Sequence, residues 1–219
     1  MKKLALLVLV VLSISIVGLA QNENPKDPKA KSILDKVSAE SKSHSTIYME
    51  FSYRIVNKPN AIDETQEGKV WIKSDQYKLM FPGLERYSDG KTMWTYLEDD
   101  DECQISSSAG DDEEENISPS SLLTIYENGF NYLYGNETTI NGKKVHMIKL
   151  FPEGGGKSYH TIKVYVNPAT NQMARIEVFS KDGNTFTYDL KVINNDIVMD
   201  NSLFVFDTSK AGDIVDLRD

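Results

Sequence analysis

The chain has 219 residues and a formal net charge of −9 at pH 7, with 24 basic residues against 33 acidic ones. This balance disfavours nucleic acid and anionic lipid surfaces as partners, because their phosphates would repel the protein. The length suits one compact domain with a sizeable core. Cys103 is the one cysteine, so no internal disulfide can form.

The first twenty residues have the pattern of an export signal. Two lysines precede an apolar run over residues 4–19, and the small residue Ala20 follows, where a signal peptidase would cut. The run is shorter than the roughly 20 apolar residues that a membrane-spanning helix needs, and polar sequence follows it directly. We therefore expect a signal peptide at 1–20 and a mature domain at 21–219. A retained membrane helix is the alternative.

The next elements are a helix and a series of strands. Asp27 and Pro28 are typical of a helix start, and apolar residues at helical spacing predict an amphipathic helix over residues 28–42. Five apolar side chains from Ile47 to Ile55 then alternate with more polar neighbours, which predicts a strand. Further strand-like runs lie at about 67–73, 76–81, 84–88, 92–98, 103–107, 144–151, 159–166, 172–180, 184–194 and 202–207.

Turn residues between these runs predict hairpins. Asp89-Gly90, Asn141-Gly142 and Asp182-Gly183 supply the positive φ that tight hairpin turns require. A second helical stretch begins at Ser118-Pro119 and ends near Gly129. No helical pattern recurs between the strands, as a parallel sheet would require. The expected architecture is therefore an antiparallel meander with two helical stretches.

Patterns that would indicate catalysis or a metal centre are weak in this sequence. A phosphate-binding loop ending at Lys157-Ser158 would need glycine at the position of Phe151, and the three histidines are isolated from one another. The acidic runs at 99–102 and 111–115 lack the spacing of a calcium loop and are interpreted as solvated loops. The chain has many carboxylate pairs, so a glycosidase-like catalytic dyad is an open alternative, but no spacing in the sequence specifically supports it. We therefore predict that the protein is not an enzyme and that it has neither a metal site nor a cofactor.

Four segments resemble the outer-membrane lipoprotein carrier (LolA) family, in that family's order. They are L-D-K-V at 34–37, Q-E-G-K-V-W-I-K at 66–73, S-D-G-K-T-M-W-T-Y at 88–96 and F-V-F at 204–206. The third segment is the most specific, because nine residues combine a turn, a strand and aromatic side chains. One departure is Ser74-Asp75, where many family members carry arginine and proline and the arginine bonds the lid helix. That type of lid latch is therefore in doubt.

The resemblance implies a mainly β (α+β) fold, an incomplete antiparallel β-barrel with helices covering an apolar cavity. It implies a periplasmic chaperone that accepts acylated lipoproteins from an ATP-driven releasing complex in the inner membrane. The cargo would pass to an outer-membrane acceptor without any catalytic residue, and we expect a monomer. A related half-barrel that senses lipid or mislocalised lipoprotein and regulates a signalling partner is the alternative.

The predicted cavity wall consists of apolar side chains on alternating strand faces, and ordinary core packing is the alternative interpretation of the same pattern. Its residues are Met49, Phe51, Tyr53, Ile55, Val70, Ile72, Tyr77, Leu79, Phe81, Trp94 and Tyr96. The predicted lid residues are Leu122, Leu123 and Tyr126.

Overall fold

The computed structural model describes residues 26–107, 124–127 and 129–218. The signal-like segment and the acidic run at 111–115 lie outside these residues. The α-helix of the described part, α1 (Pro28–Lys42), begins where the sequence predicts it. Oδ1 of Asp27 accepts bonds from the backbone N–H groups of Lys29 and Ala30, and Pro28 is the first helical residue. The predicted helix and its cap are confirmed.

Strands in the described part of the chain form one twelve-stranded sheet. They are β1 (Ile47–Asn57), β2 (Ile62–Lys73), β3 (Gln76–Phe81), β4 (Leu84–Ser88), β5 (Thr92–Leu97), β6 (Glu102–Ser107), β7 (Phe130–Ile140), β8 (Lys143–Pro152), β9 (Tyr159–Val166), β10 (Met173–Ser180), β11 (Thr185–Asn195) and β12 (Asp213–Asp216). The spatial order is β12-β6-β5-β4-β3-β2-β1-β11-β10-β9-β8-β7. Two meanders, β1–β6 and β7–β11, therefore meet where β1 pairs with β11.

Tight turns occur at the predicted glycines. Gly90, Gly142 and Gly183 have φ values of 90°, 77° and 88°, and Asn141 has a φ of 49°. Glycine adopts positive φ without steric cost, and asparagine tolerates it better than most residues. These turns join β4 to β5, β7 to β8 and β10 to β11, so the predicted meander is confirmed.

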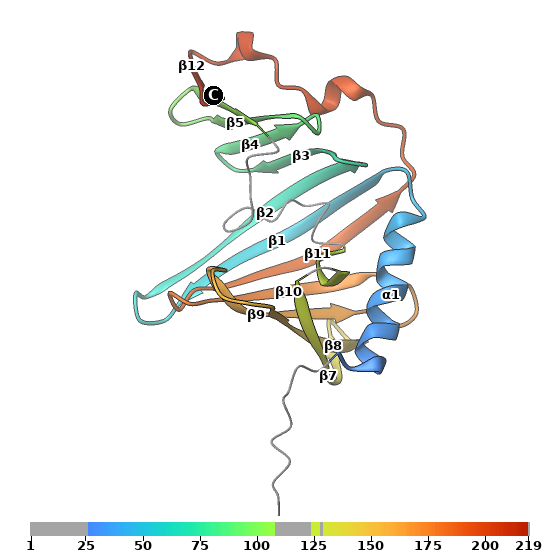
Figure 1. The fold of residues 1–219 in the computed structure, drawn as a ribbon. Helices are drawn as coiled ribbons and strands as arrows, with labels where there is room; N and C mark the ends of the chain where they lie inside the picture. The colour runs from blue at the N-terminus through green and yellow to red at the C-terminus, as the bar shows by residue number, and fades with distance from the viewer. Residues whose placement is uncertain (1–25, 108–123, 128, 219) are drawn as a thin grey trace, which may run out of the picture.

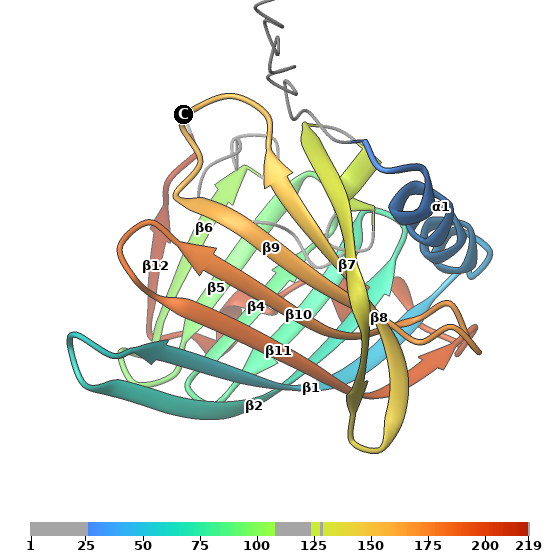
Figure 2. The same cartoon turned by 90° about the horizontal axis from the view of Figure 1, so that it is seen from below.

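The sheet is curled and open (Figures 1 and 2). Figure 2 shows β9–β11 along one side and β4–β6 along the other, with α1 at one end. Among the described residues, β7 and β12 end the strand order and do not pair with each other. All neighbouring strands are antiparallel except β12, which runs parallel to β6. The fold is thus mainly β with an unclosed, mostly antiparallel sheet, consistent with the predicted incomplete barrel.

Two of the three buried clusters of the described residues lie on one face of the sheet, which we call the inner face. At one end, Leu34 and Val37 of α1 pack against buried residues of β7–β10. Farther along the sheet, β1–β3 contribute a second buried cluster that includes Met49 and Val70. Tyr188 of β11 packs against both clusters. The helix therefore covers one part of the inner face, and the β1–β3 part adjoins it.

The opposite, outer face of β4–β6 is covered by the C-terminal segment. After β11 the chain forms the 3-10 helices η2 (Asn201–Phe204) and η3 (Thr208–Lys210) and then returns as β12 (Figure 1). The ring of Phe206 lies 5.4 Å from that of Tyr87, and Phe204 is fully buried. The predicted strand at 202–207 is therefore wrong. Its alternating phenylalanines anchor a crossing segment and do not join the sheet.

Two strands and a helical stretch also differ from the predictions. β7 and β12 were not predicted, since β7 alternates weakly and contains a bulge at Gly135 and β12 has four residues. The second helical stretch was expected from Ser118 to Gly129. Its described part contains the 3-10 helix η1 (Ile125–Glu127), and most of the remainder lies outside the described residues.

Candidate functional site

Nine of the eleven predicted wall residues lie together on the inner face of β1, β2 and β3. Met49 is opposite Val70 across β1 and β2, and Val70 is opposite Leu79 across β2 and β3. Directly opposed residues of neighbouring strands share a face, and side chains alternate along each strand. The full set on this face is Met49, Phe51, Tyr53, Ile55, Val70, Ile72, Tyr77, Leu79 and Phe81.

Trp94 and Tyr96 lie on the outer face, apart from the other nine. Trp94 is opposite Tyr87 on β4, and the Tyr96 ring stacks on Phe206 with centroids 5.1 Å apart. The inward positions of β5 are held instead by Met93 and Thr95. The alternation identified which residues of β5 share a face, but not which face turns inward. We therefore leave Trp94 and Tyr96 out of the candidate site.

Five rings form an aromatic cluster at the middle of the inner face, namely Phe51, Tyr53, Phe81, Phe186 and Tyr188. Tyr53 has ring centroids 5.6 Å from Phe81 and 5.2 Å from Tyr188, and Phe51 lies 5.4 Å from Phe81. Phe186 and Tyr188 were not in the predicted wall, although the alternation within residues 184–194 marks them. Their place became clear only because β11 pairs with β1.

Gly68 on β2 makes room for this cluster. A Cβ atom at this position would lie 2.5 Å from Cζ of Phe51 and 2.9 Å from Cε1 of Phe81. Such distances are far inside van der Waals contact, so any side chain would displace the two rings. Glycine here allows the rings to lie across the β2 backbone.

The aromatic cluster is a region of low polarity that is only partly closed. Phe51 is buried, whereas Tyr53, Phe81 and Tyr188 are partly exposed. Burial raises the pKa of the Tyr188 phenol, and burial together with the charge of Glu64 raises the pKa of Tyr53. Both phenols therefore stay neutral over the physiological range.

The predicted lid residue Tyr126 packs beside α1. Its hydroxyl donates to Oδ1 of Asp35 at 3.3 Å, and burial raises its pKa to about 12. The next residue, Glu127, accepts a 2.6 Å bond from Nζ of Lys42 and a short bond from the Ser38 hydroxyl. Polar bonds from Glu127 thus join η1 to α1. Leu122 and Leu123 lie outside the described residues.

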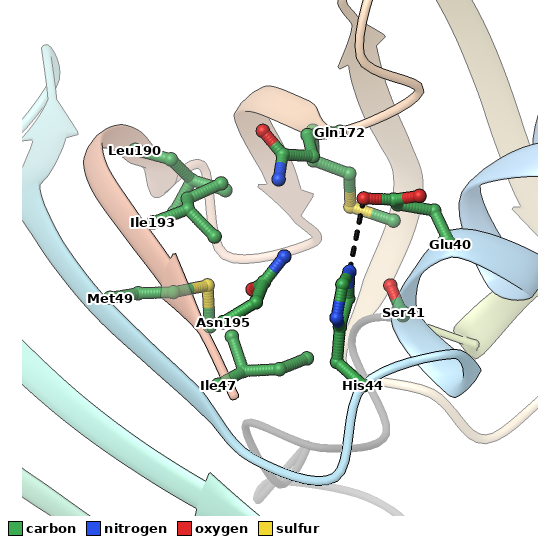
Figure 3. A pocket seen from close by; sticks show the side chains of 10 residues that line it. Glu40, Ser41, His44, Ile47, Met49, Gln172, Leu190, Ile193 and Asn195 are labelled. Carbon is green, nitrogen blue, oxygen red and sulfur yellow. Dashed lines mark hydrogen bonds and ion pairs between the residues drawn. The ribbon is translucent and has the colours of Figure 1, made fainter. Parts of the chain in front are cut away.

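A small pocket lies between the C-terminal end of α1 and the ends of β1 and β11 (Figure 3). Its cavity volume is about 20 Å³, enough for one water-sized group. An acyl chain would enter only after the surrounding side chains moved. The lining residues are Glu40, Ser41, His44, Ile47, Met49, Gln172, Met173, Leu190, Ile193 and Asn195.

His44 ties α1 to the end of β11 beside this pocket. Nδ1 lies 2.7 Å from Oδ2 of Asp196, and Nε2 lies 3.2 Å from Oε1 of Glu40. These two bonds raise the pKa of His44, and the same contact lowers the pKa of Asp196. The ring therefore bridges two carboxylates on different elements, an arrangement that favours its protonated form.

The described ranges contain neither a candidate metal cluster nor a candidate membrane-spanning helix. No group of three or more His, Cys, Asp or Glu side chains in them could hold a metal ion. No helix within the same ranges is long and apolar enough to cross a membrane.

Residues 87–207 match the family model described as outer membrane lipoprotein carrier protein LolA, and this match covers more than half of the chain. The chain belongs to the LolA family. A comparison with curated protein sequences finds no match.

Three similar solved structures have low sequence identity to this chain. An uncharacterized conserved protein from Thermus thermophilus is 12% identical, covering 86% of this chain and 99% of that one, with a TM-score of 0.55. The lipoprotein LppX from Mycobacterium tuberculosis is 12% identical, covering 80% and 100%, with a TM-score of 0.48. A LolA superfamily protein from Nitrosomonas europaea is 11% identical, covering 81% and 97%, with a TM-score of 0.45. The Thermus protein thus has the same fold as this LolA-family chain.

Proposed function

We propose that this LolA-family protein is a carrier that binds the acyl chains of lipoproteins and conveys them from the inner to the outer membrane. The observation that carries the proposal is the apolar inner face of β1–β3 and β11, which continues beyond the part that α1 covers. Its aromatic cluster is partly exposed, so a ligand can reach it. Family membership supplies the class of cargo.

The free energy of acyl chains explains why such a face is needed. Each methylene is worth about 0.8 kcal/mol, so an ordinary chain carries on the order of 10 kcal/mol against entering water. A sheet satisfies its backbone hydrogen bonds internally and offers the chain a wall of side chains alone. The wall has few hydrogen-bonding groups to anchor the chain, so binding remains reversible.

Loading at the pocket beside α1 would require movement, because that pocket holds only about 20 Å³. The rings of Tyr53, Phe81 and Tyr188 would be the part that moves, since they are partly exposed and pack against one another. An acyl chain would then replace ring-to-ring contacts by ring-to-chain contacts. This exchange involves no catalytic step, and we propose no enzymatic activity and no cofactor.

The remaining elements of the proposal follow from the family and the first twenty residues. The protein would be exported, lose residues 1–20 and act in the periplasm as a monomeric domain of residues 21–219. An ATP-driven complex of the inner membrane would load it, and an outer-membrane acceptor would unload it.

The test uses adjacent residues on opposite faces of β3. Phe81→Gln removes a ring from the aromatic cluster, and Met80→Gln removes an apolar side chain that points outward. We expect the wild type to keep a triacylated lipopeptide dissolved and to retain it through gel filtration, as mass spectrometry would detect. Phe81→Gln should weaken retention at least about tenfold while Met80→Gln does not. Failure of the wild type to retain the lipopeptide would refute the proposal.

A further inference from the structure

We infer that the pocket beside α1 binds the linkage of an amide-linked acyl chain, with Oδ1 of Asn195 accepting its N–H and the inner side of β11 holding its tail. The inference rests on the proposed function and adds a chemical preference to it. Asn195 is an inward position, because it lies opposite Ile47, which in turn lies opposite the wall residue Ile72. It also lines the pocket at the end of β11 (Figure 3).

Oδ1 of Asn195 is buried, and no described group donates a hydrogen bond to it. Buried acceptors in folded proteins are nearly always paired, because an unpaired one loses its bond to water without replacement. The nearby carboxylates of Glu40 and Asp196 are both already bonded to the His44 ring. A ligand that brings one donor to Oδ1 would therefore gain a hydrogen bond that the described side chains do not supply.

The pocket is polar toward α1 and apolar toward the sheet. Figure 3 shows Asn195 between the His44 ring on one side and Ile193 on the other. The cavity volume of about 20 Å³ accommodates one water-sized group beside the Asn195 amide. Gln172 also lines the pocket and is partly exposed, so a whole amide linkage would fit once this side chain turned outward.

The inward side chains of β11 continue from the pocket toward the aromatic cluster. Successive strand residues are about 3.3 Å apart, so Leu190 lies roughly 16 Å from Asn195 along the strand. A bilayer core about 30 Å thick holds two acyl chains end to end, so one chain spans roughly 15 Å. A tail whose linkage lies at Asn195 would therefore reach Leu190, which is opposite Phe51 of the aromatic cluster.

An amide linkage matches this arrangement better than an ester. Both place a carbonyl group beside the tail, but only the amide has an N–H to donate to the acceptor Oδ1. A primary ammonium would also donate, but burying its charge carries a desolvation cost that a neutral amide avoids. The ligand class is therefore a neutral N-acyl group, such as that of an N-acylated lipopeptide.

Asn194 provides a matched control on the outer face. It lies opposite Tyr48, one position away from the inward pair of Asn195 and Ile47, and it is exposed. An Asn194→Leu variant therefore makes the same chemical change outside the pocket.

The experiment compares two neutral probes with the same tail. N-palmitoylglycine methyl ester has the amide N–H, and methyl palmitoyloxyacetate has an ester oxygen in its place. In the wild type we expect the amide probe to bind about tenfold more tightly, measured by displacement of a fluorescent lipid. Asn195→Leu should remove this preference without weakening the ester probe. Asn195→Ser, which keeps an acceptor oxygen, should retain part of the preference, and Asn194→Leu should retain all of it.

Stability of the ligand-free protein gives a second readout. Because Oδ1 has no donor, Asn195→Leu should not lower the urea concentration at the midpoint of unfolding. A lower midpoint together with equal losses for both probes would mean that Oδ1 holds a trapped water only, and it would overturn the inference.

The binding data decide the remaining alternatives. Equal binding of both probes by the wild type, or an unchanged preference in Asn195→Leu, would overturn the inference. Tighter, Asn195-dependent binding of hexadecylamine would replace the neutral amide by an ammonium and overturn the assigned class. If the triacylated lipopeptide and both probes bind without a preference, the inference fails and the proposed function stands. If none of these ligands binds, the proposed function itself fails.

Discussion

The carboxylate of Glu127 lies 2.6 Å from Nζ of Lys42, which joins the short helix η1 to the last turn of α1 across 85 positions of sequence. The Ser38 hydroxyl donates to the same carboxylate oxygen, and these two bonds lower the pKa of Glu127. α1 thus has a polar contact with η1 as well as apolar contacts with the sheet.

Glu127→Gln should loosen η1 from α1. The charged pair is partly solvated, so we expect a loss of less than about 1 kcal/mol in the free energy of unfolding. Because the pKa of Glu127 is lowered in the folded state, the pair stabilises above the ordinary value of 4.5 and is lost as the pH falls through the lowered value. Hydrogen exchange of residues 125–127 should speed up in the variant. Glu67→Gln, which removes a surface partner of Lys191, should leave that exchange unchanged.

Protonation of His44 should stabilise the end of α1. A raised pKa means that the contribution is present below the ordinary pKa of 6.5 and disappears as the pH rises through the folded-state value. We expect the wild type to exceed His44→Gln in stability by up to about 1 kcal/mol at pH 5.5 and by less at pH 8.5. Urea unfolding at both values measures the difference. His160→Gln is the control, and a gap for His44→Gln that widens with pH would contradict the prediction.

Gly68→Ala should disturb the aromatic cluster. The added methyl group meets Phe51 and Phe81 at distances that require both rings to shift, which we expect to cost about 1–3 kcal/mol. Gly155→Ala is the matched control, because nothing lies within 4 Å of its Cβ position. Thermal unfolding separates the two variants. Equal stability would mean that the rings adapt without strain.

Phe204→Ala should remove the anchor of the C-terminal segment. Its side chain is fully buried, so we expect a loss of about 3–5 kcal/mol. The neighbouring Val205 is 45% exposed, and Val205→Ala should change stability by less than about 0.5 kcal/mol. Chemical unfolding curves test both, and comparable losses would contradict the assigned packing.

Local signals in the sequence predicted much of this fold. α1, β3, β4 and β9 begin and end at the predicted residues, because caps, alternation and turn glycines act over a few positions. The same alternation predicted which residues of β1 lie on the inner face. Family resemblance supplied the remaining expectation of an open, curled sheet.

Features that depend on distant contacts were not predictable in this way. Trp94 and Tyr96 alternate as a buried face should, yet which face of β5 turns inward depends on the C-terminal segment, whose Phe206 packs on Tyr96. β12 forms only because residues 213–216 return to pair with β6.

The pairing of β1 with β11 also bears on how the chain reaches this state. Ile47 lies opposite Asn195, so the seam between the two meanders closes only after nearly all of the polypeptide is present. Contacts this remote in sequence slow the search for the native arrangement, and folding in milliseconds to seconds is typical of such topologies. Until then each meander leaves an unpaired edge strand. A newly synthesised chain would therefore need chaperones to keep these edges from aggregating.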